Sequence, residues 1–265
     1  MAKIACWNVN SVRVRLELLR RLINNYQPDI LCLQEIKAKE VDFPYDFFKS
    51  CGFEYIALYG MAGYNGVAIL SRLPLQNVRR RQWCGKDDAR HIAVEVAGIE
   101  LHNLYIPAGG EIPDAESNPA FAHKLQFIKE VGDFFAQEDA NRPRLVCGDF
   151  NVAPLENDVW NHQKMLKIIS HTPAETTLLQ QFFRQGHFTD CIRQQFPEPQ
   201  KVYSWWSYRN LNWQTNNKGR RLDHMWCSAP LAGRIIRAEV LSEFRALDRP
   251  SDHVPLLLEL SGGIH

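Results

Sequence analysis

Short apolar runs that end in polar residues are the most regular feature of this chain. Runs of about four to eight residues with apolar character, bounded by polar or turn-forming residues, are typical of buried strands. They predict strands over residues 3–9, 29–33, 66–71, 91–96, 100–105, 144–150, 234–241 and 253–260. Gly98 lies between two of these runs and predicts a hairpin turn.

Two segments instead have apolar residues spaced three and four positions apart, the period of an amphipathic helix. They predict helices over residues 12–25 and about 119 to 137, and Pro28 closes the first. Their apolar positions are Leu18, Leu19, Leu22 and Ile23, and then Leu125, Ile128, Val131 and Phe135. Residues 156–169 and 176–185 are also predicted to be mostly helical, and 41–66 to be mostly loop. The opening order of strand, helix and strand favours an α/β fold.

The composition is that of an ordinary globular protein. Of the 265 residues, 45% are hydrophobic and 23% are charged, so the chain can bury a sizeable core. There is no internal repeat and no low-complexity linker, and we therefore expect one domain over residues 1–265. The 31 basic and 30 acidic residues leave a net charge of +1, so any surface that attracts nucleic acid has to be local.

Neither a membrane span nor a secretion signal is indicated by the sequence. No apolar run approaches the roughly 18 residues that a span requires. The first residues lack a charged segment followed by a long apolar one. The seven cysteines are scattered and form no CxxC pair, which favours free thiols in a reducing compartment. We expect a cytoplasmic monomer with no membrane partner.

The run at 144–150 leads into Gly148-Asp149-Phe150-Asn151, the most informative polar pair in the chain. Side chains two residues apart on an extended backbone point to the same side. The Asp149 carboxylate and the Asn151 amide should therefore face the same way. Taken alone, such a residue is usually a helix cap or a turn former. In an α/β enzyme the same pair could hold a metal ion, a water molecule or a phosphate.

Several other strand-like runs also end in polar side chains. They are Asn8, Glu35, Tyr105, Asp223, and Asp252 with His253. Each has an ordinary structural explanation when it is considered alone. Because mixed sheets collect ligands at one end of their strands, the joint occurrence predicts one shared site.

The chemistry of this set is coherent. Glu35 and the Asn8 carboxamide are hard oxygen donors, which suit Mg²⁺ or Mn²⁺. His253 follows Asp252, and Asp223 adds a further carboxylate that could orient the imidazole. The neutral donors Asn151 and Tyr105 could hold an oxyanion. Because nothing resembles a serine-nucleophile elbow or a Walker loop, this set favours metal-assisted attack of water on a phosphate ester.

Six ordered segments contain these residues. They are Trp7-Asn8-Val9-Asn10-Ser11-Val12-Arg13, Leu33-Gln34-Glu35-Ile36-Lys37, Leu104-Tyr105-Ile106-Pro107, Gly148-Asp149-Phe150-Asn151-Val152, Arg221-Leu222-Asp223 and Ser251-Asp252-His253. Together they resemble the motifs of the exonuclease III type of apurinic/apyrimidinic endonuclease, in the endonuclease/exonuclease/phosphatase superfamily. The resemblance runs from residue 3 to about 258.

This resemblance implies a four-layer α/β sandwich, with two mixed central sheets flanked by helices. It also implies a Mg²⁺-dependent DNA-repair phosphodiesterase, for which Mn²⁺ is a plausible substitute. Its expected substrate is double-stranded DNA that contains abasic sites or 3′ ends. The enzyme would cut the backbone 5′ to an abasic site and would also have 3′→5′ exonuclease and 3′-end-trimming activity.

The resemblance also implies roles for individual residues. The implied metal-side residues are Glu35 as main ligand, with Asn8, Asn10 and Asp252. The implied catalytic residues are Tyr105, Asp149, Asn151, Asp223 and His253. Among them, Asp149 would be the acid/base carboxylate held with Asn151. His253 would contact the scissile phosphate and would be oriented by Asp223.

The implied DNA-facing residues are Arg13, Lys37, Arg90, Trp205, Trp206, Arg220 and Leu222. Trp205 would form an apolar wall that accepts a flipped-out abasic sugar and excludes a normal nucleotide, and Trp206 would support it. Plain core packing is the other explanation of this pair. A local basic surface could also include Arg79, Arg80, Arg81, Arg209, Lys218 and Arg221.

Two positions depart from the family pattern. Ala108 stands where relatives have a polar side chain, and Arg220 stands where some have an aromatic wedge. Both bear on the balance between abasic-site incision and exonuclease activity. Alternative functions are another superfamily phosphoesterase, such as an RNA deadenylase or a phosphoinositide phosphatase, or a catalytically silent DNA-binding relative. The Trp205–Trp206 pair argues against the first alternative, and the presence of every motif acid argues against the second.

Overall fold

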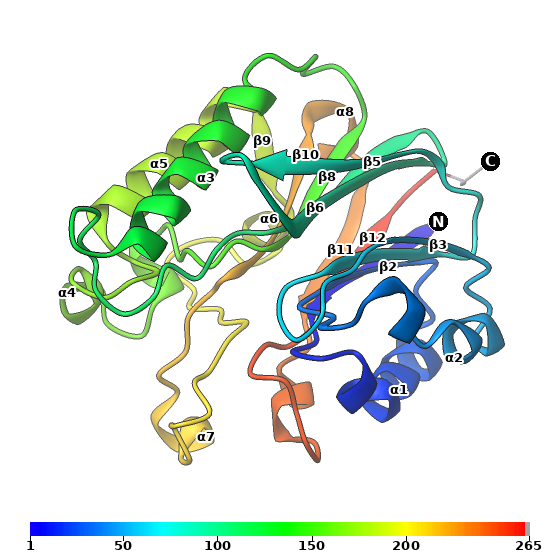
Figure 1. The fold of residues 1–265 in the computed structure, drawn as a ribbon, viewed down its shortest axis with the longest axis horizontal. Coiled ribbons are helices and arrows are strands. Elements are labelled where there is room, and N and C mark those ends of the chain that lie inside the picture. Colours follow the sequence, from blue (N-terminus) through cyan, green and yellow to red (C-terminus); the bar gives the residue numbers. More distant parts are fainter. Residues whose placement is uncertain (263–265) are drawn as a thin grey trace.

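Two stacked six-stranded sheets form the centre of the structure, a computed structural model that describes residues 1–262 (Figure 1). Helices cover the outer faces of both sheets. The predicted four-layer α/β sandwich is therefore confirmed. The expected domain over residues 1–265 includes residues 263–265, which lie outside the described residues. Among the helices of residues 1–262, none has the length and apolar character required to cross a membrane.

The first sheet has the strand order β11-β12-β1-β2-β4-β3. Its strands are β1 (Ala2–Asn8), β2 (Ile30–Gln34), β3 (Tyr55–Tyr59), β4 (Val67–Ser71), β11 (Ile235–Val240) and β12 (Leu256–Leu260). Strands β1 and β2 are parallel, and the other neighbours are antiparallel. Strands from early and late in the chain thus lie side by side.

The second sheet has the strand order β5-β6-β7-β8-β10-β9 and comes from the middle of the chain. Its strands are β5 (Gln76–Trp83), β6 (Lys86–Val96), β7 (Ile99–Tyr105), β8 (Arg144–Asp149), β9 (Phe188–Asp190) and β10 (Asp223–Ser228). Strands β7 and β8 are its parallel pair. The predicted turn at Gly98 is confirmed, because Ala97 (φ 52°) and Gly98 (φ 74°) join β6 to β7 in a two-residue hairpin loop.

Four helices form most of the outer layers: α1 (Leu16–Tyr26) and α2 (Tyr45–Ser50) beside the first sheet, and α3 (Pro119–Phe135) and α5 (Pro173–Gln185) beside the second. The shorter helices are α4 (His162–Met165), α6 (Cys191–Gln195), α7 (Trp213–Asn216) and α8 (Ala229–Ala232). The 3₁₀ segments are η1 (Arg13–Arg15), η2 (Glu40–Asp42), η3 (Glu156–Asp158) and η4 (Ser242–Ala246).

The central strands are buried on both faces. Cys6, Cys32, Cys147 and Met225 are among the residues that fill the space between the sheets. The outward faces pack against the helices, as Leu31 does on the α1 side. This double burial explains the continuous apolar runs in the sequence. All seven cysteines, each within residues 1–262, are free thiols.

Two element predictions were wrong. Residues 41–66 were expected to be mostly loop, but they contain α2, β3 and the end of η2. Strand β3 lies at the sheet edge, where its exposed Tyr55 weakens the apolar pattern. Residues 156–169 were expected to be mostly helical but contain only η3 and α4 among their regular elements. Val159 is extended instead (φ −130°, ψ 153°) and pairs with Arg220.

Candidate active site

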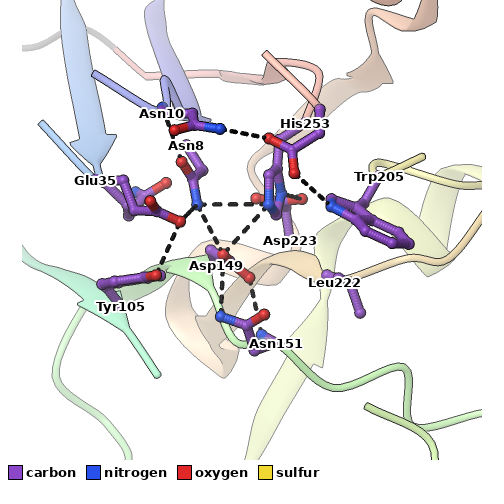
Figure 2. Close-up of polar contacts among 12 residues, drawn as sticks. Asn8, Asn10, Glu35, Tyr105, Asp149, Asn151, Trp205, Leu222, Asp223 and His253 are labelled. Carbon is purple, nitrogen blue, oxygen red and sulfur yellow. Dashed lines mark hydrogen bonds and ion pairs between the residues drawn. The ribbon is translucent and has the colours of Figure 1, made fainter. Parts of the chain in front are cut away.

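The two parallel strand pairs end at the same edge of the sandwich, and their last residues form the floor of the site (Figure 2). In the first sheet, Asn8 ends β1, and Glu35 follows β2. In the second, Tyr105 and Asp149 end β7 and β8 and lie opposite each other. The two sheets therefore contribute different members of one polar cluster.

Antiparallel strands bring the remaining residues to this edge. Asp223 is the first residue of β10 and lies opposite Asp149. Asp252 and His253 precede β12, which runs antiparallel to β1. The expectation that Asp223 follows the end of a strand was therefore wrong, whereas Asp252 and His253 introduce their strand, as the predicted bounds 253–260 imply. They reach the same edge because an antiparallel strand begins where its partner ends.

Asn8 connects the two halves of the cluster. Its Nδ2 donates hydrogen bonds to Glu35 Oε1 at 3.0 Å and to Asp149 Oδ2 at 2.9 Å. The Tyr105 hydroxyl donates to Glu35 Oε1 at 2.8 Å from the second sheet. Asn8 is fully buried, so these hydrogen bonds form away from bulk solvent. The polar contacts thus fix the first sheet against the second at the site.

The His253 imidazole lies between two carboxylates. Its Nδ1 is 2.8 Å from Asp223 Oδ2, and its Nε2 is 3.5 Å from Asp149 Oδ2. Burial alone would lower the pKa of His253, but the charges of Asp223 and Asp149 raise it well above its usual value. Burial, with the nearby Asp223 charge, raises the pKa of Asp149 above its usual range even though His253 opposes this. The buried acids and the imidazole are therefore poised to share protons.

The turn after β8 places Asn151 against Asp149, so the predicted contact is confirmed, but the extended backbone expected between them was wrong, because β8 ends at Asp149. Asn151 has a left-handed backbone (φ 53°). Its backbone N–H donates to Asp149 Oδ1 at 2.9 Å, and its Nδ2 donates to Asp149 Oδ2 at 3.2 Å. Gly148 (φ 145°) is required just before, because a Cβ there would lie 1.8 Å from the Leu104 carbonyl oxygen.

The donor set fits a hard divalent cation. Hydrogen bonds from Asn8 and Lys37 outweigh burial and hold the pKa of Glu35 below its usual value, so this carboxylate is charged. The buried Asp223 Oδ1 has no hydrogen-bond partner among the described residues. Asp149, Asp223 and His253 form a second group with ligand atoms within 4.8 Å of one another, but the raised pKa of His253 favours the protonated imidazole, which cannot bind a metal. Carboxylate and carboxamide oxygens are the ligands that Mg²⁺ and Mn²⁺ prefer.

Asn10 and Asp252 lie beside this donor set. Asn10 Nδ2 donates to Asp252 Oδ1 at 3.1 Å, and Trp205 Nε1 donates to Asp252 Oδ2 at 2.9 Å. The Lys37 ammonium lies 2.9 Å from Glu35 Oε2 and donates to Asn10 Oδ1 at 2.6 Å. Lys37 therefore contacts the residues on the expected metal side directly.

An open cleft of about 350 Å³ borders the cluster at Asn151 and Leu222. Arg220 also lines this cleft, and its guanidinium lies 4.9 Å from the centre of a Trp205 ring. Arg220 Nη1 donates to the Ile169 carbonyl at 3.1 Å and to Ser170 Oγ at 2.9 Å. Trp205 is half-buried, whereas Trp206 is 3% exposed and packs in the core. The structure thus brings Trp205, Arg220 and Leu222 to the site, whereas Trp206 packs in the core.

The other predicted cations differ in their surroundings. Arg13 is exposed on η1. Arg90 forms an ion pair with Asp88 at 2.5 Å and lies over the Tyr105 ring, 4.8 Å from its centre. Arg221 was expected at the surface, and this was wrong. It is fully buried and forms ion pairs with Asp158 at 2.6 Å and Asp190 at 2.7 Å.

Sequence reasoning missed two serines that hold the motif loops. Ser204 Oγ accepts hydrogen bonds from the backbone N–H groups of Leu222 and Asp223, both at 3.0 Å. Ser251 Oγ donates to the Asn8 carbonyl at 2.7 Å and accepts from the His253 N–H at 3.2 Å. Ser251 lies within a motif and could have been identified, whereas Ser204 has no local signal.

This fold and this cluster define a class of protein. Two stacked mixed sheets that gather carboxylates, amides and an imidazole at one edge have the architecture and the donor set of a metal-dependent phosphoesterase. The family model described as "Endonuclease/Exonuclease/phosphatase family" matches residues 5–253. The chain therefore belongs to the endonuclease/exonuclease/phosphatase family.

Individual relatives are similar over nearly their full lengths. Exodeoxyribonuclease III of Haemophilus influenzae is 30% identical over 97% of this chain and 99% of its own. An AP endonuclease from Archaeoglobus fulgidus superposes with a TM-score of 0.92 at 29% identity, covering 99% of this chain and 100% of its own. The 3′ phosphatase NExo from Neisseria, solved with a product DNA hairpin, has a TM-score of 0.91 at 32% identity and the same coverage.

Proposed function

We propose that this chain is a Mg²⁺-dependent DNA-repair nuclease. It cuts the backbone of double-stranded DNA 5′ to abasic sites, degrades 3′ ends and trims blocked ones. The observation that carries this proposal is the cluster itself, in which Asn8 hydrogen-bonds both Glu35 and Asp149 across the two sheets. The activities of the relatives named above support the choice of DNA over other phosphate esters.

The residues of the chain divide the work of hydrolysis. Asp149 takes a proton from the attacking water, and its raised pKa brings it closer to the pH at which a general base is most effective. His253, oriented by Asp223, donates a hydrogen bond to the scissile phosphate. Asn151 and Tyr105 donate hydrogen bonds to Asp149 and Glu35 in the structure, and on substrate binding these donors would turn to the developing charge on the phosphate oxygens. The water oxygen forms a new bond to phosphorus, the bond from phosphorus to the 3′ oxygen breaks, and that oxygen takes a proton from solvent water.

Glu35 would hold the divalent cation, with Asn8, Asn10 and Asp252 beside it. The cation would supply stabilisation of negative charge on the phosphate. Mn²⁺ should replace Mg²⁺, since the donor atoms are all oxygen. Trp205 and Leu222 offer apolar contact to the sugar of the substrate, and Arg13, Lys37 and Arg90 supply positive charge for DNA phosphates.

Cleavage of a defined duplex tests this proposal. A 5′-labelled duplex with one abasic analogue is incubated with enzyme in Mg²⁺, in Mn²⁺ and in a chelator. We expect a single nick on the 5′ side with either metal and none with the chelator. Glu35→Ala should lose most of this activity, and Lys129→Met, on the exposed face of α3, should retain it. Turnover of a phosphoinositide or of poly(A), without a nick, would overturn the proposal.

We also propose that the protein is a monomer in the cytoplasm. The free state of all seven cysteines, which lie within residues 1–262, supports a reducing compartment. Light scattering coupled to gel filtration tests the oligomeric state, and a mass near 30.6 kDa is expected. Cell fractionation with an antibody tests the compartment.

A further inference from the structure

Lys124 of α3 is fully buried, an unusual position for a lysine. Its ammonium contacts three oxygens from three separate segments. It lies 2.5 Å from Glu175 Oε1, and it donates to the Asn151 carbonyl at 2.7 Å and to the Ala108 carbonyl at 3.2 Å. These contacts match the three N–H donors of an ammonium group.

Both carboxylate oxygens of Glu175, the partner of Lys124, also accept hydrogen bonds. Glu175 is in the first turn of α5 and forms a capping box with Thr172. Its oxygens accept hydrogen bonds from the backbone N–H groups of Ser170 and Thr172, and from Thr172 Oγ1 at 2.7 Å. The Lys124–Glu175 pair therefore joins the loops after β7 and β8 to the start of α5.

The loop after β7 leaves room for the Lys124 side chain because it has a glycine at position 109. Gly109 has a left-handed backbone (φ 93°), and a Cβ there would lie 2.9 Å from Lys124 Cδ. A buried ion pair of this kind adds little net stability compared with apolar residues of similar size. The geometric effect of the pair on the loops is therefore the better explanation of its presence.

The loop after β8 contains Asn151, the residue whose conformation the Lys124–Glu175 pair affects. Asn151 has a left-handed backbone, and its side chain donates to Asp149 Oδ2 at 3.2 Å and to the Ile106 carbonyl at 2.9 Å. Its carbonyl oxygen points the other way, to Lys124. The hydrogen bond from Lys124 fixes the orientation of the peptide group that follows Asn151. This also fixes the direction in which the side-chain amide of Asn151 points.

We propose that Lys124, paired with Glu175, is a positioning residue for hydrolysis: it holds the Asn151 carbonyl so that the Asn151 amide stays aligned with Asp149 and the phosphate. This inference rests on the proposed nuclease function. Its action goes through Asn151, because the Lys124 ammonium is buried beneath the site and uses its donors on protein oxygens. Loss of Lys124 should therefore affect the chemical step more than DNA binding.

The first test is the rate of Lys124→Met on the abasic duplex, with Lys129→Met on the same helix as the exposed control. Lys129 forms a surface pair with Asp133 at 2.6 Å. We expect Lys124→Met to lower kcat by roughly 10- to 100-fold, the size of effect of a displacement of about 1 Å near reacting groups. KM should change little, and Lys129→Met should match the wild type.

A double-mutant cycle with Asn151→Ala separates positioning from a general structural effect. If Lys124 acts through Asn151, adding Lys124→Met to Asn151→Ala should lower kcat little further. Equal losses in both backgrounds, or a loss confined to KM, would overturn the proposal. Melting temperatures are measured for all four proteins, and the double variant Lys124→Met/Glu175→Gln is used if Lys124→Met does not fold.

A crystal structure of the folded Lys124 variant gives a readout that does not depend on activity. We expect the Asn151 amide to leave Asp149 Oδ2. An unchanged Asn151 backbone and side chain would overturn the inference even if the wild type proved to cleave another ester. A wild type that neither nicks abasic duplex nor degrades 3′ ends contradicts the proposed function instead, so the two failures are distinguishable.

Discussion

The two ends of the parallel pair β7–β8 both bury charged groups, but they arrange them in opposite ways. Where the strands begin, Glu100 lies opposite Arg144. Glu100 forms ion pairs with Arg144 and with Arg79, both at 2.6 Å. Where the strands end, Asp149 has the further acid Asp223 opposite it on β10. One end matches acids to bases, and the other brings acids together.

The pKa values of the two ends shift in opposite directions. Burial opposes ionisation of Glu100, but His102 and Arg144 hold its pKa far below the usual range. Burial raises the pKa of Asp149, and the Asp223 charge adds to this. The same two strands thus bury charges that are fully paired at one end and keep an acid available for proton transfer at the other.

Removing the Asp149 carboxylate, at the end of the strands that carries the candidate active site, should give the largest effect on activity. We expect Asp149→Asn to lower kcat by about 10²- to 10⁴-fold, the usual contribution of general acid–base catalysis. Its melting temperature, measured without metal, should be unchanged or higher, because a neutral amide removes the cost of burying a charged carboxylate and also the repulsion from Asp223. Single-turnover cleavage and thermal denaturation measure the two effects. An unchanged rate would exclude Asp149 as the acid/base carboxylate.

Removing a base at the other end should affect stability instead. Arg144→Met leaves Glu100 buried without one of its two closest cations, which costs about 3 kcal/mol of unfolding free energy. Below the melting transition its cleavage rate should equal that of the wild type. Urea unfolding measures the cost, with Arg237→Met as control, since Arg237 is 59% exposed in its pair with Glu239. A slowed reaction would show that the two ends are not independent.

At the end where Glu100 pairs with Arg144, His102 should also make the free energy of unfolding depend on pH. Burial lowers the pKa of His102 to about 4, whereas an unfolded histidine has a pKa of about 6.5. Between these values the unfolded state binds more protons, so stability falls as the pH drops from about 6.5 to 4. The loss attributable to His102 should be about 2–3 kcal/mol at pH 4.5.

Urea unfolding at pH 7 and pH 4.5 tests this dependence on a His102→Gln variant. The variant should lose less stability than the wild type on acidification. The same pH dependence in both proteins would assign it to other groups.

Replacing Arg220 should have the smallest effect, on substrate preference. Its guanidinium lies over Trp205 beside the cleft, a contact worth about 0.5–1 kcal/mol at exposed sites. Arg220→Ala should expose the ring and change the ratio of abasic-site incision to 3′→5′ digestion by roughly 2- to 5-fold. Side-by-side rates on an abasic duplex and a 3′-recessed duplex give this ratio. An unchanged ratio would mean that Arg220 does not influence substrate choice.

The strands could be predicted from the sequence because the sheets are buried on both faces. Every predicted strand is present, with shifted ends in some cases. Edge strands were harder: β3 was missed because its exposed positions interrupt the apolar pattern. The helix prediction for residues 156–169 failed for another reason. Asp158 is held by Arg221 and Arg193, contacts that no local pattern reveals.

The residues of the site also divide into those with a local sequence signal and those whose position depends on tertiary contacts. Glu35, Asp149 and His253 were identified because motif residues stand beside recognisable strands, and the structure brings them together. Asp223 was identified but assigned to the wrong end of its strand, since its position depends on antiparallel pairing with β8. Nothing in the sequence singled out Lys124 within its predicted helix, because its burial against Asn151 is a property of the tertiary structure.

The place of β12 between β11 and β1 has a consequence for synthesis of the protein on the ribosome. Strand β1 is made long before β12, so one edge of β1 stays open until β12 has been translated. An open strand edge is a site for unwanted pairing, and the growing chain carries this liability until β12 pairs with β1. His253 precedes β12, and the complete cluster therefore forms only after the last sheet neighbours meet. An unfinished chain would contain the acids of the site but could not cut DNA.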